Sequence, residues 1–328
     1  MNLFILTNNP NRASFRQRIA IYLDTLREKG LNCEVAKLPS GSLARRQLFK
    51  KTAEFDGVFL NRKGLNLFNA FWLGKYSRKL IYDFDDAIMY SVKNPERNSW
   101  SHFIPFRRSA GLADMIIAGN SYLAQHARRF NPNVVVLPTG LDVNAYKVPA
   151  NPENDGKIRL VWIGSRSTLK YLAEIKPALE QIGSRFNNAI LRIVCDDFFD
   201  LKNMDVEKYQ WSLEKQAVDL AASHIGLAPL PDNRFTRGKC GFKILQYEAA
   251  SLPVVASPVG VNSEYVRDNV TGLFAISIQE WIEKITQLIM NPQLRKQMGK
   301  EGLVQVKNFD TGIIGKKLVE LITKCLAG

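Results

Sequence analysis

The strongest constraint on the fold is a regular alternation of short apolar runs with amphipathic segments. The apolar runs are continuous rather than alternating, as strands are when helices cover both faces of a parallel sheet. Between two of these runs, Ser14–Lys29 places Phe15, Ile19 and Leu26 on one helical face, with Ser14 as a possible cap and Gly30 as the end. In the first half, the expected strands are Asn2–Leu6, Cys33–Lys37, Gly57–Leu60, Lys79–Asp83, Met115–Ala118 and Val134–Leu137.

The second half repeats this rhythm after a polar segment, Asn144–Lys157, that contains proline and glycine. The alternation predicts an α/β protein of two doubly wound, Rossmann-like domains that face each other across a cleft at the carboxyl ends of their strands. The predicted domains are residues 1–148 and 149–308, and a helix within 309–328 is expected to pack back toward the first domain. The expected strands are Ile158–Ile163, Ile190–Val194, Ile225–Ala228, Val254–Ser257 and Leu273–Ala275, and the expected helices are Thr168–Ile182, Leu213–Ser223, Phe242–Ala250, Ile278–Met290 and Pro292–Lys307.

The composition fits such a protein and indicates its class of partner. The chain has 328 residues, enough for two domains, and a net charge of +14, which favours nucleic acid, anionic lipid or phosphorylated ligands. No apolar run approaches the roughly 20 residues that span a bilayer, and the N-terminal segment lacks the features of a secretory signal. The four cysteines are widely spaced, which indicates free thiols in a reducing compartment.

The segment Arg237–Gly260 contains the most informative loop of the chain. Gly238 and Gly241 flank Lys239 just before an expected helix, and Lys243 follows in its first turn. Glycines at a helix start let a phosphate approach free backbone N–H groups, and the lysines add positive charge at the same end. The loop therefore predicts a diphosphate site, with an ordinary loop–helix junction bearing surface lysines as the alternative.

A second anion site is expected in Val161–Lys170, after the first strand of the second half. This strand ends at Gly164, and hydroxyl side chains, Arg166 and Lys170 follow at the entrance of a helix. The alternative is that the hydroxyl groups only cap the helix. Because both loops follow strands of the same predicted sheet, together they favour one phosphate-binding domain.

The segment Gly238–Gly260 resembles the donor-binding signature of glycosyltransferase family 4, whose members have the two-domain GT-B fold. The family pattern is a Glu, a loop glycine, a second Glu and then a Gly-x-Pro-Val-Val strand. Aligned on Pro253, the loop glycine is Gly241, whereas Gly238 and Gln246 stand at the two glutamate positions. A subgroup with Lys-Cys-x-Phe-Lys at the loop also has Gln at the later position, and this sequence is similar to it.

Further segments along nearly the whole chain resemble the same family. Lys170 stands at the family's phosphate-loop lysine, while Ser165 stands at the arginine position with Arg166 beside it. The other similar segments are Ala13–Arg18, Tyr82–Ile88, Ala118–Asn120, Pro138–Asp142 and Trp211–Pro231.

The resemblance implies a metal-independent, retaining hexosyltransferase that takes its sugar from a nucleotide-diphosphate donor. It also implies no cofactor and a lipid-linked or cell-surface glycan acceptor, such as lipopolysaccharide or capsule. Cationic side chains and main-chain amides would stabilise the departing phosphate in place of a metal ion. Gln246 is expected to hydrogen-bond the ribose. The expected donor-binding residues are Arg166, Lys170, Gly241, Phe242, Lys243, Gln246 and Glu264, with Lys239 as a catalytic cation.

Asp83, Asp85 and Asp86 lie together at the end of an expected strand of the first half. Three interpretations are open for them: a carboxylate that stabilises an oxocarbenium ion or orients the acceptor, a cap for the following loop, and a divalent-metal site. The first is favoured and assigns Asp85 as catalytic, because Asp85 stands where related proteins often carry the His of a His-Asp pair. Arg16 and Arg18, near the start of the first expected helix, are expected to contact a phosphate of donor or acceptor, with surface placement as the alternative.

The apolar segment Leu65–Tyr76 and the basic groups of the first half suggest peripheral contact with an anionic membrane, at its cytoplasmic face. Leu67, Phe68, Phe71 and Trp72 are nevertheless more commonly core residues, so burial is the favoured expectation for them. Three competing functions are a nucleic-acid binder, for which the sequence has no motif, a nucleotide-sugar epimerase of the same fold, and a binding-only relative without transfer.

Overall fold

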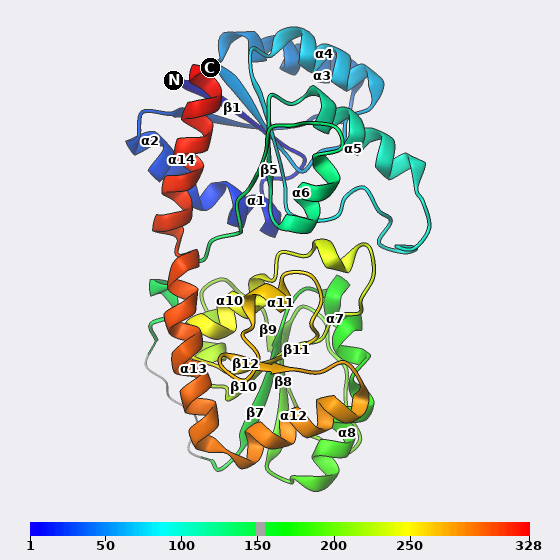
Figure 1. The fold of residues 1–328 in the computed structure, drawn as a ribbon, viewed down its shortest axis with the longest axis vertical. Helices are drawn as coiled ribbons and strands as arrows, with labels where there is room; N and C mark the ends of the chain where they lie inside the picture. The colour runs from blue at the N-terminus through cyan, green and yellow to red at the C-terminus, as the bar shows by residue number, and fades with distance from the viewer. Residues whose placement is uncertain (149–154) are drawn as a thin grey trace. The chain divides into compact units, whose positions relative to one another are not determined.

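The computed structural model describes residues 1–148 and 155–328, so the centre of the expected linker and the domain boundary there lie outside the described residues. The described chain divides into two compact units (Figure 1). The first comprises Met1–Gly140, Asn233–Cys240 and Thr311–Gly328, and the second comprises Leu141–Asp232 and Gly241–Asp310. The chain thus passes between the units several times, and the short segment Asn233–Cys240 belongs to the first.

The first unit is built on a parallel six-stranded sheet with the order β2-β1-β3-β4-β5-β6. β3, β4 and β5 are buried along their whole length because helices cover both faces, as their continuous apolar runs predict. The strand order changes direction between β1 and β3, and doubly wound sheets bind ligands at the carboxyl ends beside such a point. The strands are β1 Asn2–Thr7, β2 Asn32–Lys37, β3 Gly57–Asn61, β4 Leu80–Phe84, β5 Met115–Ala118 and β6 Val134–Val136.

Helices α3 to α6 pack on one face of this sheet, and α1, α2 and α14 pack on the other. The expected helix Ser14–Lys29 is interrupted at Ile19, whose backbone leaves the helical region, although Phe15, Ile19 and Leu26 are buried as predicted. Gly30 has a φ of +81°, which suits the glycine that ends this segment. The helices are α1 Ala13–Arg18, α2 Leu23–Glu28, α3 Ser42–Lys51, α4 Leu67–Tyr76, α5 Trp100–Leu112, α6 Ser121–Ala127 and α14 Thr311–Ala327, with short 3₁₀ helices at Ala20–Tyr22, Thr52–Glu54 and Thr236–Gly238.

The second unit contains another parallel six-stranded sheet, with the order β12-β11-β10-β7-β8-β9. β7 and β10 have the predicted bounds, and β8, β11 and β12 differ from theirs by at most one residue at each end. β9 is not predicted by its sequence, because it is a polar strand at the sheet edge. The strands are β7 Ile158–Ile163, β8 Ala189–Cys195, β9 Val206–Gln210, β10 Ile225–Ala228, β11 Val254–Ala256 and β12 Gly272–Phe274.

Helices α7, α8 and α12 pack on one face of the second sheet, and α9 and α10 on the other. The expected helix Thr168–Ile182 is two helices, because the chain turns at Ile175 and Pro177 begins the second. The helices are α7 Arg166–Ala173, α8 Lys176–Arg185, α9 Gln216–Ala221, α10 Phe242–Ala249, α11 Asn262–Tyr265, α12 Ile278–Met290 and α13 Pro292–Val306, with short 3₁₀ helices at Asn144–Tyr146 and Lys307–Phe309.

The cysteines and the apolar segments agree with what the sequence predicts for them. All four cysteines are unpaired. Within residues 1–148 and 155–328, none of the helices has the length and apolar character needed to cross a bilayer.

Glu248, on α10, is completely buried and leads to a prediction about stability. Its Oε1 accepts a hydrogen bond from Gln305 Nε2 at 3.1 Å, and burial raises its pKa to about 8. The folded chain therefore keeps a proton that the unfolded chain loses above about pH 4.5, so stability from this group is lost as the pH rises through about 8. Between pH 4.5 and 8, Glu248→Gln is expected to gain on the order of 5 kcal/mol in free energy of unfolding relative to the wild type, and urea denaturation measures the change.

The exposed residue Glu283 on α12 provides the matched control for this comparison. Glu283→Gln is expected to follow the pH dependence of the wild type. If Glu248→Gln also follows it, Glu248 does not titrate with a raised pKa in the folded chain.

Candidate active site

In the first unit, Asp83 near the carboxyl end of β4 is buried against two polar partners. Arg18 Nε lies 3.1 Å from Asp83 Oδ1, and Asn61 Nδ2 donates to Asp83 Oδ2 at 3.0 Å. Arg18 Nη1 also donates to the carbonyl oxygen of Leu137 at 2.6 Å, and Nη2 pairs with Asp83. The guanidinium group is thus buried and engaged at all three nitrogens. These contacts give Arg18 a structural role within the first unit, and its expected contact with a ligand phosphate stays a prediction.

Asp85 and Asp86 directly follow β4 and share the guanidinium group of Arg62. Arg62 Nη1 lies 3.7 Å from Asp85 Oδ1, and Nη2 forms an ion pair with Asp86. Asp85 Oδ1 is buried and accepts no hydrogen bond from the part of the chain that is described. Burial raises the pKa of Asp85, against the opposing effect of the Arg62 charge. The result is a buried carboxyl group whose Oδ1 lies near the Arg62 charge but accepts no hydrogen bond within the described residues.

Sequence reasoning missed Arg62, although it directly follows β3 at the point where the strand order changes. Its φ of +52° is unusual for a residue with a side chain. This backbone conformation accompanies the placement of the side chain between two carboxylates that follow the neighbouring strand. The sequence feature that could have identified Arg62 is a basic residue directly after a buried apolar strand.

Lys239 lies in the segment Asn233–Cys240, which packs within the first unit. Its Nζ is 3.2 Å from Asp86 Oδ1, and its carbonyl oxygen accepts a hydrogen bond from Asn120 Nδ2 at 3.1 Å. Asp85 and Lys239, the two residues expected to be catalytic, therefore belong to one cluster, in which Arg62 and Asp86 connect them.

Arg16 lies on α1, in the same unit as Arg18. Its Nη1 donates to the carbonyl oxygen of Asn11 at 2.9 Å. The guanidinium group therefore helps to hold the loop between β1 and α1 at the carboxyl edge of the first sheet. Its expected contact with a ligand phosphate stays a prediction.

In the second unit, α10 begins at Gly241 with a φ of +62°. A Cβ at this position would lie 2.7 Å from Val261 Cγ2, so both the backbone and the space favour glycine. Phe242, the first residue of α10, is partly buried against the hydrophobic core of the second unit. Lys243 Nζ lies 4.3 Å from the ring centroid of Trp162. The helix start thus combines backbone N–H groups with a lysine held above an aromatic ring.

Gln246 lies one turn further along α10 and is buried. Its Nε2 donates to Tyr146 Oη at 2.8 Å and to Gln216 Oε1 at 3.0 Å. The donor half of the expected ribose contact is therefore already used by two side chains of the second unit.

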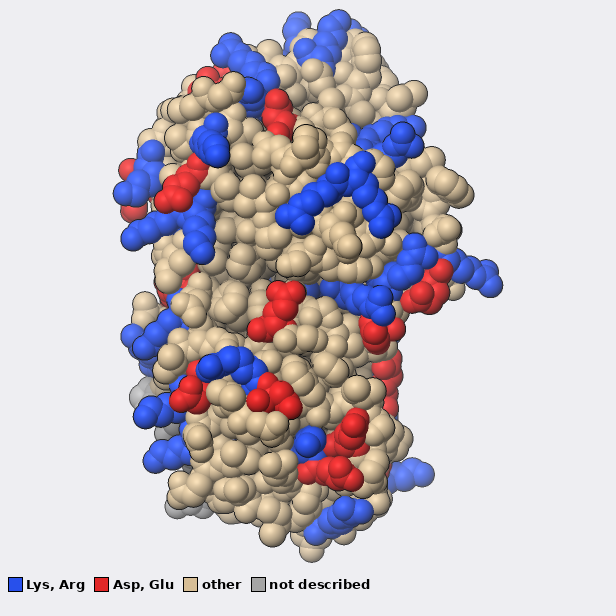
Figure 2. Space-filling model, viewed as in Figure 1, with Lys and Arg blue, Asp and Glu red and all other residues tan. Residues whose placement is uncertain are grey.

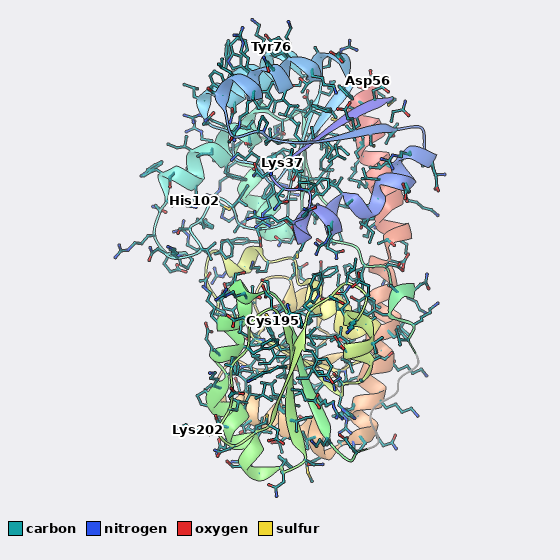
Figure 3. The ribbon with its side chains drawn as sticks, turned by 180° about the vertical axis from the view of Figure 1, so that it is seen from behind. Lys37, Asp56, Tyr76, His102, Cys195 and Lys202 are labelled. Carbon is teal, nitrogen blue, oxygen red and sulfur yellow. The ribbon has the colours of Figure 1, made fainter. Side chains whose placement is uncertain are left out.

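The start of α7 carries acidic partners that sequence reasoning missed. The backbone N–H of Arg166 donates to Asp196 Oδ1 at 2.9 Å, and Arg166 Nε lies 3.1 Å from Asp197 Oδ2. Both aspartates follow Cys195, the last residue of β8, which Figure 3 labels. The sequence feature that could have identified these aspartates is their position directly after a buried apolar run, at the same sheet edge as Arg166.

Two other expected donor-binding residues lie in the second unit. Lys170, on α7, has its Nζ 5.2 Å from the ring centroid of Tyr171. Glu264 is exposed on the single-turn helix α11.

A pocket of about 390 Å³ lies in the second unit, at the carboxyl ends of β10, β11 and β12. It is walled by Pro229–Asp232 and Ser257–Val259, by Glu174 at the end of α7 and by Trp281 of α12. None of the residues that the sequence predicts for donor binding lines this pocket. The residues that the structure describes contain no group of three or more His, Cys, Asp or Glu side chains able to hold a metal ion.

Comparison with known proteins finds one matching family model and several solved structures of similar fold. Residues 146–304 match the family model described as Glycosyl transferases group 1. None of the curated proteins matches the chain in sequence. Among solved structures, Anabaena Alr3699/HepE in complex with UDP and glucose has a TM-score of 0.74 at 17% identity, covering 99% of this chain and 100% of that chain.

Two further solved structures have the same fold. Sucrose-phosphate synthase from Thermosynechococcus elongatus has a TM-score of 0.75 at 13% identity, covering 99% of both chains. WaaG, a glycosyltransferase involved in lipopolysaccharide biosynthesis, has a TM-score of 0.72 at 16% identity, covering 98% of this chain and 100% of that chain. The expected fold of two Rossmann-like domains is confirmed: this protein has the GT-B fold, and its residues 146–304 match the glycosyl transferases group 1 model.

Proposed function

We propose that this chain is a retaining glycosyltransferase of the family 4 type that transfers a sugar from a nucleotide-diphosphate donor to a lipid-linked or cell-surface glycan acceptor. The observation that carries the proposal is the match of residues 146–304 to the group 1 model, together with the helices α7 and α10, which begin at one sheet edge with Arg166 and Lys243 in their first turns. Helix starts with added cations bind phosphate groups. Of the similar solved structures, HepE is in complex with UDP or with UDP-glucose, and WaaG is described as a glycosyltransferase involved in lipopolysaccharide biosynthesis.

The donor pyrophosphate is proposed to bind at the start of α10, against the backbone N–H groups beside Gly241 and Phe242 and the ammonium group of Lys243. Lys170 is proposed to neutralise the same group. Arg166 is proposed to bind the pyrophosphate as well, by releasing Asp197 and pairing with the phosphate instead. Its side chain is 76% exposed, so it can move in this way. As the glycosidic bond breaks, negative charge grows on the phosphate oxygens, and these fixed donors stabilise it.

In the first unit, Asp85 is proposed to stabilise positive charge on the sugar or to orient the acceptor hydroxyl. The absence of a hydrogen bond to its Oδ1 within the described residues and its buried position suit a carboxyl group that acts on a reacting centre. Lys239 is proposed to stabilise the leaving phosphate by giving up part of its pairing with Asp86. We further propose that the reaction needs no divalent metal and takes place at the cytoplasmic face of a membrane.

The direct test is a thermal-shift panel with UDP-, GDP-, CMP- and dTDP-sugars, each with and without EDTA, followed by transfer assays on lipid-linked acceptors. A shift with one donor that EDTA leaves unchanged, together with acceptor-dependent product, supports the proposal. Conversion of the donor without an acceptor would identify an epimerase, and binding without any product would identify a binding-only protein. Loss of turnover with EDTA would contradict the metal-independent mechanism.

Lys243→Ala is expected to weaken binding of the nucleoside diphosphate roughly 10-fold or more, because it removes a charge-assisted contact to phosphate. Isothermal titration with the diphosphate that gives the largest thermal shift measures the effect. Lys296→Ala, at an exposed position on α13, is the matched control and is expected to bind as the wild type does. Equal affinities for the Lys243 variant and the wild type would remove Lys243 from the donor site.

A further inference from the structure

The outer surface of α3 and α4 combines large exposed apolar side chains with cations. Leu43 on α3 is 73% exposed, and Leu67 and Phe71 on α4 are 70% and 59% exposed. This corrects the expectation that Leu67, Phe68 and Phe71 belong to the core, since Phe68 is exposed as well, whereas Trp72 is partly buried against it. The fully buried residues of α4 are Asn69 and Leu73. We use the name α3–α4 face for the surface formed by Leu43, Arg46, Lys50, Leu67, Phe71 and Lys75, all of which are exposed.

The residues of this face form one surface because the two helices lie side by side and run in the same direction. α3 connects β2 to β3, which lie on either side of β1, and α4 connects the neighbouring strands β3 and β4. All of these strands are parallel, and the two helices pack against each other (Figure 1). Leu43 and Leu67 stand in the first turns of these helices, and Lys50 and Lys75 stand in their last turns. Arg46 Cζ lies 4.3 Å from the ring centroid of Trp72, which joins the two helices.

The charge of the α3–α4 face has one sign. Neither Ser42–Lys51 nor Leu67–Tyr76 contains an acidic residue. The space-filling view shows Lys and Arg side chains over the upper end of the molecule, where α3 and α4 lie (Figure 2). Figure 3 labels Tyr76, the last residue of α4, at that same end of the first unit.

This combination selects among the partners that a basic surface can bind. Nucleic acid would use the cations but would leave Leu43, Leu67 and Phe71 without an apolar partner. A second copy packed through the same face would bring cations against cations, because a two-fold interface buries the same patch on both subunits. An anionic bilayer satisfies both parts, since its phosphates attract cations and its interfacial region accepts leucine and phenylalanine.

We propose that the α3–α4 face docks this protein peripherally on an anionic lipid bilayer, with Leu43, Leu67 and Phe71 inserted at the interface and Arg46, Lys50 and Lys75 at the level of the phosphates. The proposal assigns the surface and the lipid charge that a membrane contact uses. It does not depend on sugar transfer, because binding to vesicles requires neither donor nor acceptor.

The test is co-sedimentation of the full chain with phosphatidylcholine vesicles that contain or lack phosphatidylglycerol, at low and high salt. The wild type is expected to bind the anionic vesicles, and less so at high salt. Leu67→Ser/Phe71→Ser is expected to bind roughly 10-fold more weakly, and Arg46→Gln/Lys50→Gln roughly 20-fold more weakly on anionic vesicles only. The matched controls on α12 and α13 are Met290→Ser/Val304→Ser and Lys296→Gln/Lys300→Gln, which are expected to bind as the wild type does.

Several results would overturn the proposal. One is a wild type that stays in solution with anionic vesicles or binds neutral vesicles equally well. Another is an equal loss of binding in the α3–α4 and control variants, which would indicate dependence on overall charge only. Conversion of a dimer to a monomer by Leu67→Ser/Phe71→Ser would show that a second copy covers the face. Tight binding of a nucleic acid that Arg46→Gln/Lys50→Gln abolishes, with no vesicle binding, would assign the face to that ligand.

Discussion

Replacement of Asp85 by asparagine is expected to lower kcat for sugar transfer at least about 100-fold, with little change in the KM for the donor. Asparagine has nearly the same shape but cannot carry the negative charge that the proposed role requires. Because Asp85 is buried beside Arg62, the variant keeps the packing of the loop after β4. Initial rates at saturating donor and acceptor, compared with the wild type, measure the effect.

The pH dependence of the same variant provides a second readout. Burial raises the pKa of Asp85, so the acid limb of the wild-type kcat profile is expected above the ordinary aspartate pKa of about 3.9. Asp85→Asn is expected to lose this limb. Asp24→Asn, at an exposed position on α2, serves as the control and is expected to keep both the rate and the limb. A rate for Asp85→Asn close to that of the wild type would show that its carboxylate takes no part in the reaction.

Arg18→Ala is expected to lower the free energy of unfolding by about 3–5 kcal/mol, because it leaves the buried carboxylate of Asp83 without its cation. Both side chains are almost completely buried, and Asn61 remains as the hydrogen-bond donor to Asp83. Equilibrium denaturation in urea, monitored by circular dichroism, measures the change.

The pair Arg27 and Asp24 on α2 is the matched control. Its atoms Nη1 and Oδ1 are 3.0 Å apart, but both side chains are largely exposed, so Arg27→Ala is expected to cost less than about 1 kcal/mol. Arg18→Met/Asp83→Asn removes both buried charges and is expected to be more stable than Arg18→Ala. If Arg18→Ala costs no more than Arg27→Ala, the buried pair does not hold the first unit together, and Arg18 returns as a candidate ligand contact.

The elements that sequence patterns predicted well are those with a local physical cause. β5, β7, β10 and α12 have the expected bounds because their apolar runs or periodicity end at clear local signals. α12 is an example, since Ser277 Oγ accepts the Glu280 N–H at its start. β9 was missed because an edge strand exposes part of its surface and need not be apolar.

The candidate site was predictable in part for the same reason. The acidic segment after β4 and the glycine–lysine loop before α10 were visible because residues adjacent in sequence act together. The partners of these residues come from distant segments: Arg62 for Asp85, Asp86 for Lys239 and Asp197 for Arg166. Pattern analysis has no access to such pairings, which depend on which strand ends meet.

The sequence by itself determined two parallel sheets with helices on both faces, because continuous apolar runs and helical periodicity are local properties of the chain. Only the tertiary structure decided which polar residues those sheets bury and which apolar ones they leave outside. Arg18 is buried in an ion pair with Asp83, and Phe71 is exposed rather than buried. The physical reason is that burial and charge pairing depend on contacts between segments far apart in sequence, and the register of strands and helices sets those contacts.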